Sequence, residues 1–213
     1  IDGSLLIEAH RNQFSSLIRP NRLPRGYNEI IAEIKIKEGN GVAWGAPGIY
    51  LYWAPEDWLG LRFYEDGYYV IEGHAAGKWI RYRGPSLEMI GSWNDPPEEG
   101  AWRSQNRMDW NILRLSLTPN SVGFYAFMEG GEPEFLASIP RPRHEQPWLI
   151  IGKGYSSGTS NNLFHTNSHP TPGPMGKTYI DDVKIEADGN VLLYDDFERD
   201  DIGDVWVTLI DGD

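Results

Sequence analysis

The sequence has no cysteine, so it can form no disulfide, no thiolate metal site and no cysteine nucleophile. Basic residues are also scarce: 19 Lys and Arg stand against 31 Asp and Glu, for a net charge of −12. Affinity for a phosphate backbone depends on clustered Lys and Arg, so nucleic acid is excluded as the expected partner. No apolar run of 18 or more residues occurs, so no membrane-spanning helix is expected.

What the sequence does contain is typical of one folded domain. Its 213 residues are 40% hydrophobic and 13% aromatic, which is enough for a sizeable core. All-β folds of this length are commonly single domains, so we expect one domain over residues 1–213. The chain begins at Ile1 without a methionine or a signal peptide, so we expect a processed product or an excised segment.

Negative charge gathers at the C-terminal end. Residues 181–213 contain twelve acidic residues against only Lys184 and Arg199. Apolar residues with a strand-like spacing alternate with these acids, which indicates a folded segment rather than a solvated tail. A hard cation such as Ca²⁺ would make it easier to fold so many carboxylates together.

Period-2 alternation of apolar and polar residues recurs along the chain and predicts an antiparallel β-sandwich. Residues 29–37 and 111–117 are the clearest examples, and turn residues such as Asp66-Gly67 separate the segments. The other expected strands are 4–9, 14–18, 48–53, 59–65, 68–73, 78–83, 122–128, 134–138, 147–152, 178–186, 190–194 and 205–210. Residues 84–107 and 155–177 fit no strand and are expected to be long loops, either functional or simple surface excursions.

Three segments in order resemble a known superfamily. They are DWNILRLSLTPNSVGFYAF (109–127), PWLIIGKG (147–154) and TYIDDVKIEADGNVLLYDDFE (178–198). This order is similar to the concanavalin A-like lectin/glucanase superfamily, in its laminin-G-like jelly-roll branch. The resemblance extends from about residue 28 onward and implies a jelly-roll fold more strongly than it implies a function.

One segment departs from the order in that superfamily. The acidic stretch 195–213 resembles the segment that opens the domain in relatives, yet here it closes the chain, and residues 1–10 read as its continuation. Three explanations fit. The domain is circularly permuted, it is one unit of a tandem array, or it donates its last strand to a neighbour. The last explanation predicts self-association through residues 195–213.

The resemblance also implies a structural calcium ion. Laminarinase- and lichenase-type enzymes of this fold hold Ca²⁺ with backbone carbonyls and an aspartate of the closing strand. By position, the corresponding ligands are Gly39, Asp181 and Asp196. The alternative is that Asp181 and Asp182 pair with Lys184 at the start of a strand.

Abundant aromatic residues favour a carbohydrate-binding surface. Nine Trp and eleven Tyr exceed what the core needs, and flat rings stack on sugar faces while planar polar groups bind hydroxyls. The alternation predicts that Arg62, Tyr64 and Tyr69 share one face, which Trp79 extends. Exposed platforms are expected at four tryptophans in or beside loops: Trp53, Trp58, Trp93 and Trp102.

No catalytic motif stands out. The paired carboxylates of β-glucan hydrolases on this fold have no counterpart here. Glu72, His74, Arg81 and Tyr82 form a weak acid/base group, in which His74 is better explained as a turn residue.

Three functions therefore remain. The leading one is a secreted or cell-surface jelly-roll module that binds a polysaccharide or glycan, with structural calcium. The alternatives are a glycoside hydrolase or polysaccharide lyase on the same fold, and a structural or adhesive unit of an extracellular array assembled by strand exchange.

Overall fold

All fourteen strands expected from the alternation are present in a computed structural model of the chain. The model describes residues 3–9, 15–39, 47–64, 66–90, 97–154, 163, 176–198 and 202–210, and within these ranges it has strands and no helix. No membrane-crossing helix occurs in this described part. The strands are β1 (Leu5–Ala9), β2 (Ser15–Ile18), β3 (Ile30–Glu38), β4 (Gly48–Ala54), β5 (Asp57–Phe63), β6 (Tyr69–Ala75), β7 (Lys78–Tyr82), β8 (Asn111–Leu117), β9 (Ser121–Met128), β10 (Glu134–Pro140), β11 (Trp148–Lys153), β12 (Gly176–Ala187), β13 (Asn190–Asp195) and β14 (Val207–Ile210).

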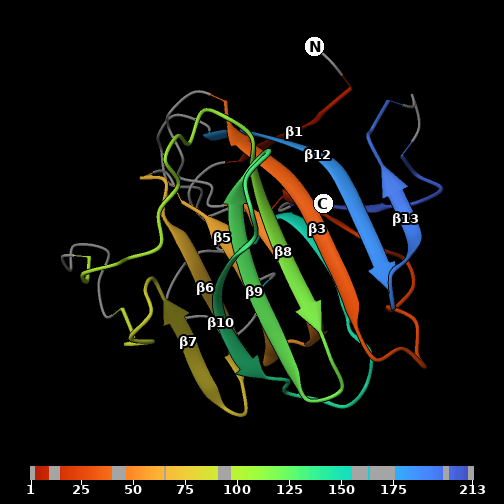
Figure 1. Ribbon diagram of the computed structural model, residues 1–213. Helices are drawn as coiled ribbons and strands as arrows, with labels where there is room; N and C mark the ends of the chain where they lie inside the picture. The colour runs from red at the N-terminus through yellow and green to blue at the C-terminus, as the bar shows by residue number, and fades with distance from the viewer. Residues whose placement is uncertain are drawn as a thin grey trace.

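The strands form two seven-stranded antiparallel sheets (Figure 1). The first has the order β1-β12-β3-β8-β9-β10, with β13 beside the second half of β12, and the second has the order β14-β2-β11-β4-β5-β6-β7. A bulge at Asp181–Lys184 divides the long strand β12, so that β1 pairs before it and β13 after it. The predicted antiparallel jelly-roll sandwich is confirmed.

The inner faces of both sheets share one hydrophobic core. On β3 the residues Ile30, Ala32, Ile34 and Ile36 are buried while their neighbours are partly exposed, as the alternation predicts. The second sheet differs, because β6 is buried at every position. Its outer face has a smaller cluster of its own, formed by Tyr50, Trp58, Ile150 and Leu163.

The C-terminal segment completes the second sheet of the same molecule. Strand β14 pairs with β2. Just before it, Trp206 donates an indole hydrogen bond of 2.7 Å to the buried Asp195 carboxylate, and Arg19 donates to the Val205 carbonyl at 3.2 Å. Pairing within one chain is what a circularly permuted domain requires. Exchange of this strand between molecules stays a prediction.

We predict that Trp206→Phe lowers the free energy of unfolding by about 1.5–3 kcal/mol, the usual worth of a hydrogen bond to a charged group. Urea denaturation measures this change. The control Val207→Ala, at a position 46% exposed, should change stability by less than about 0.5 kcal/mol. Equal effects of the two substitutions would show that the indole hydrogen bond does not anchor the C-terminal segment.

Candidate functional site

Five ring-bearing side chains line up across the outer face of the second sheet. The strand register places them directly opposite one another, one from each of five neighbouring strands: Trp148 (β11), Tyr52 (β4), Trp58 (β5), His74 (β6) and Trp79 (β7). We call this set the aromatic row. With strands about 4.8 Å apart, the row is about 19 Å long.

The two ends of the aromatic row reach the surface. Tyr52, Trp79 and Trp148 are partly exposed, while Trp58 and His74 are buried. Rings of the row contact one another: the centroids of Tyr52 and Trp148, on adjacent strands, are 6.4 Å apart, and those of Trp58 and Trp79, on the strands that flank β6, are 5.7 Å apart. Such contacts restrict the rings to fixed orientations.

A buried ion network lies beside the row on the same face. The Glu72 carboxylate accepts hydrogen bonds from Arg81 Nε at 2.8 Å and Arg81 Nη2 at 2.6 Å, and its other oxygen is paired with Arg62. Burial opposes ionisation of Glu72, but the charges of Arg62 and Arg81 outweigh it and hold the pKa of this carboxyl below its usual range. Glu72 is therefore a permanent anion with both oxygens engaged.

Two further contacts connect this network to its surroundings. Arg62 donates to the Gly154 carbonyl at 3.1 Å, and the Tyr64 hydroxyl lies 3.4 Å from a Glu72 oxygen. Leu163 packs on Tyr50 and its cluster at the centre of the face. Because this cluster includes Trp58, the middle of the aromatic row is covered, and the row is accessible at its Trp79 end and at its Tyr52 and Trp148 end.

The predicted sugar-binding residues are only partly brought together. Arg62, Tyr64 and Trp79 lie on the outer face, as expected. The placement of Tyr69 with them is wrong, because Tyr69 lies directly opposite Phe63 and so shares its inward face. Its ring stacks on Phe63 at 5.6 Å, and its hydroxyl donates to Asn111 at 2.7 Å.

The expected exposure of the loop-flanking tryptophans is also wrong where the structure describes them. Trp53, Trp58 and Trp102 are 2%, 0% and 6% exposed. Trp53 faces the main core and donates its indole hydrogen to the Glu145 carbonyl at 2.7 Å, and Trp102 packs in the same core. Trp93 lies outside the described residues.

The four weak catalytic candidates do not form an acid/base group. Tyr82 lies opposite Ile71 and packs against the main core, whereas Glu72 and Arg81 face outward. His74 Nδ1 lies 2.5 Å from the Glu56 carbonyl oxygen. A general acid needs a pKa near the working pH, and Glu72 is shifted the other way.

Of the three predicted calcium ligands, two lie near each other. Burial and the neighbouring charges of Asp182 and Asp196 raise the pKa of Asp181. The Gly39 N–H donates a hydrogen bond to the Lys177 carbonyl. Lys177 lies four residues from Asp181 along β12, which corresponds to about 13 Å of strand, so the grouping of Gly39 with Asp181 is not supported. The Asp182 carboxylate is paired with Lys35 at 2.5 Å rather than with Lys184. Within the described ranges, no group of three or more His, Asp or Glu is clustered to hold a metal.

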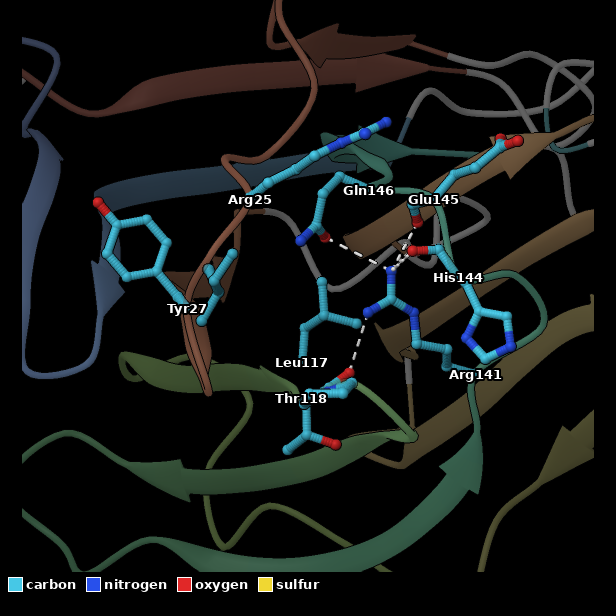
Figure 2. A pocket seen from close by; sticks show the side chains of 10 residues that line it. Arg25, Tyr27, Leu117, Thr118, Arg141, His144, Glu145 and Gln146 are labelled. Atoms are coloured by element: carbon cyan, nitrogen blue, oxygen red, sulfur yellow. Dashed lines mark hydrogen bonds between the residues drawn. The ribbon is translucent and has the colours of Figure 1, made fainter.

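A pocket of about 470 Å³, which we call the end pocket, lies at one end of the sandwich and was not predicted from the sequence. Its wall comes from the β2–β3 connection, the β8–β9 turn and the β10–β11 connection (Figure 2). These segments are far apart along the chain. The only local signal is the proline-flanked stretch 140–147, which predicts a constrained loop.

Tyr52 and Trp148 were not predicted as site residues, because only the pairing of β4 with β11 brings them together. Both alternate correctly in their own strands, but a single sequence does not show that β4 and β11 are neighbours.

No protein-family model and no curated protein matches the chain. Solved structures similar to it include a prokaryotic beta-1,3-1,4-glucanase (lichenase) derived from a mouse hindgut metagenome, with 10% identity, a TM-score of 0.48 and coverage of 83% of this chain and 79% of that one. A functionally unknown protein from Saccharomyces cerevisiae has 11% identity, a TM-score of 0.47 and coverage of 87% and 96%. The galectin LEC-6 of Caenorhabditis elegans has 12% identity, a TM-score of 0.39 and coverage of 68% and 94%. At these identities each likeness concerns the fold alone.

We predict that Glu72→Gln lowers the free energy of unfolding by about 3–5 kcal/mol, because it leaves two buried arginines without their counter-charge. In the wild type, the stabilisation by Glu72 is complete above its ordinary pKa of 4.5 and is lost as the pH falls through the lower folded value. The unfolding free energies of wild type and variant should therefore approach each other as the pH falls below 4.5. The control Glu8→Gln, in an exposed pair with Lys177, should have a much smaller effect. A stable Glu72→Gln protein would contradict a structural role.

Proposed function

We propose that this protein binds a polysaccharide or glycan along the outer face of its second sheet. The aromatic row is the observation that supports this proposal. It has partly exposed rings at both ends, Tyr52 and Trp148 at one and Trp79 at the other, within a row about 19 Å long, and flat rings of this kind stack on the apolar faces of sugar residues.

Planar polar groups lie where sugar hydroxyls would be met. The Arg22 guanidinium lies 4.0 Å from the centroid of the Trp148 ring, and Arg81 lies 5.3 Å from that of Trp79. The Trp148 end of the row thus combines a ring with a partly exposed guanidinium, whereas at the Trp79 end Arg81 is buried and bonded to Glu72. Since the buried ion network fixes the underlying strands, the surface needs little ordering before it binds.

The two alternatives have less support. An enzyme would need an acid and a base, and the carboxylate on this face is already committed to two arginines. An array built by strand exchange would need β14 to leave β2, with which it pairs in the same chain.

Secretion and calcium belong to the proposal as separate parts. A polysaccharide ligand is met outside the cell, so we propose a secreted or cell-surface location. For calcium, Asp181 and Asp196 would supply two oxygens, and the remaining ligands would be carbonyls and water.

We predict that Trp79→Ala and Trp148→Ala each abolish or strongly weaken retention on one class of soluble polysaccharide in native affinity electrophoresis. Each change removes one ring of the row, and one stacked ring is worth about a tenfold change in affinity or more. The control is Phe135→Ala, an aromatic residue 56% exposed on β10 of the other sheet. Retention lost equally in the control, or unchanged in both row variants, would contradict binding at the row.

For the calcium part, we predict that millimolar Ca²⁺ raises Tm relative to EDTA and that Asp181→Asn removes the difference. Burial, together with the charges of Asp182 and Asp196, raises the pKa of Asp181, and a bound cation would stabilise the ionised carboxylate against both effects. Magnesium at the same concentration is the control. Equal Tm values in Ca²⁺ and EDTA would contradict a calcium site.

A further inference from the structure

The end pocket is large enough for a sugar residue. Its wall shares no residue with the aromatic row, and Arg22, which lies on Trp148, joins the two through its bonds to Glu145 and Gln146. Its volume of about 470 Å³ is within the range of small-molecule sites. Ile30 and Leu117 are buried apolar residues in its wall. Figure 2 shows Tyr27 and His144 on opposite sides of the pocket, with the Arg141 guanidinium between them.

Arg141 gives the pocket a rigid wall. Its guanidinium donates to the carbonyls of Thr118 at 3.1 Å and Arg143 at 2.7 Å. It also donates to the carbonyls of His144 at 3.1 Å and Glu145 at 2.6 Å, and to Gln146 Oε1 at 3.5 Å. These bonds hold the β10–β11 connection in one conformation and fix it against the β8–β9 turn, so the pocket is largely formed before any ligand enters.

The charge of Arg141 is not balanced by a carboxylate. All five acceptors are neutral oxygens, and burial lowers the pKa of the guanidinium. Glu145 is the single acidic residue among those that line the pocket. Its carboxylate is paired, at 3.3 Å, with Arg22, a residue that does not line the pocket. A partly buried cation therefore makes this pocket positive in a chain whose net charge is −12.

Donors in the pocket remain available for a ligand. Within the described part of the chain, the Arg25 guanidinium and the Tyr27 hydroxyl make no hydrogen bond or ion pair, and the Gln146 amide nitrogen has no acceptor. Figure 2 shows Arg25 and Gln146 on the same side of Arg141. An anionic group at the Arg25 guanidinium would lie in the field of the second guanidinium, that of Arg141, and the Gln146 amide N–H₂ is a further donor on this side of the pocket.

We propose that the end pocket binds a sugar residue that bears a carboxylate, such as a uronic acid. The carboxylate lies at Arg25 and Gln146, and the apolar face of the sugar ring packs on Tyr27, Ile30 and Leu117. The site uses no residue of the aromatic row. The inference that its ligand is a carbohydrate rests on the proposed function, whereas the inference that the ligand is anionic does not.

The test is calorimetric titration of the full chain with glucuronate and galacturonate, with glucose and galactose as uncharged probes. We expect at least one uronate to bind about tenfold or more tightly than the matching neutral sugar, with an affinity that falls as salt rises. Arg25→Gln should lower the uronate affinity about tenfold without loss of Tm, because the residue is exposed and makes no internal bond. Arg103→Gln, at an exposed arginine outside the pocket, should leave it unchanged.

Further variants separate this site from the aromatic row. Trp79→Ala should leave uronate binding intact, and Arg25→Gln should leave polysaccharide retention through the row intact. Uronate binding without any polysaccharide retention would overturn the proposed function alone. Loss of uronate binding in Trp79→Ala, or no effect of Arg25→Gln, would overturn the end pocket as the site. Acetate or sulfate binding as tightly as uronate would overturn the sugar and show a simple anion site.

Discussion

The buried pairing of Glu72 with Arg62 and Arg81 is the constraint on which the second sheet depends. It crosses three neighbouring strands, β5, β6 and β7, on a face that lies away from the main core. Ions without a partner are strongly disfavoured in such a place, so the three strands are held in one register. The contact from Arg62 to Gly154 extends this restraint to the segment that follows β11.

That register determines where a ligand can lie. On β6 and β7, the rings of His74 and Trp79 lie two residues along the strand from Glu72 and Arg81. The same strand pairing places a ring from each of five strands in the aromatic row. The end pocket has a different origin, because its wall is built by three connections and held by the hydrogen bonds of Arg141. The sandwich therefore has two distinct features: a row of aromatic rings across the second sheet, and a cavity that is lined by cationic groups.

The strands were predictable from the sequence because alternation is a local property, and β3 shows it with four buried residues in step. Alternation does not reveal which faces are covered. Trp58 was expected to be exposed and is buried because the second sheet is covered on its outer face as well. Tyr69 faces the core because the hairpin pairs it with Phe63, which depends on the length of the turn. The row and the pocket depend on contacts between distant segments, which no local pattern encodes.

If glycan binds at the aromatic row, as we propose, it will change the surroundings of the Trp79 and Trp148 indoles. The most direct measurement follows the indole N–H signals of the nine tryptophans by NMR as a retained polysaccharide fragment is added. The signals of Trp79 and Trp148 should shift or broaden, while those of Trp53 and Trp206, whose indoles donate to groups within the protein, should stay in place. Unchanged Trp79 and Trp148 signals in the presence of a bound fragment would contradict the claim.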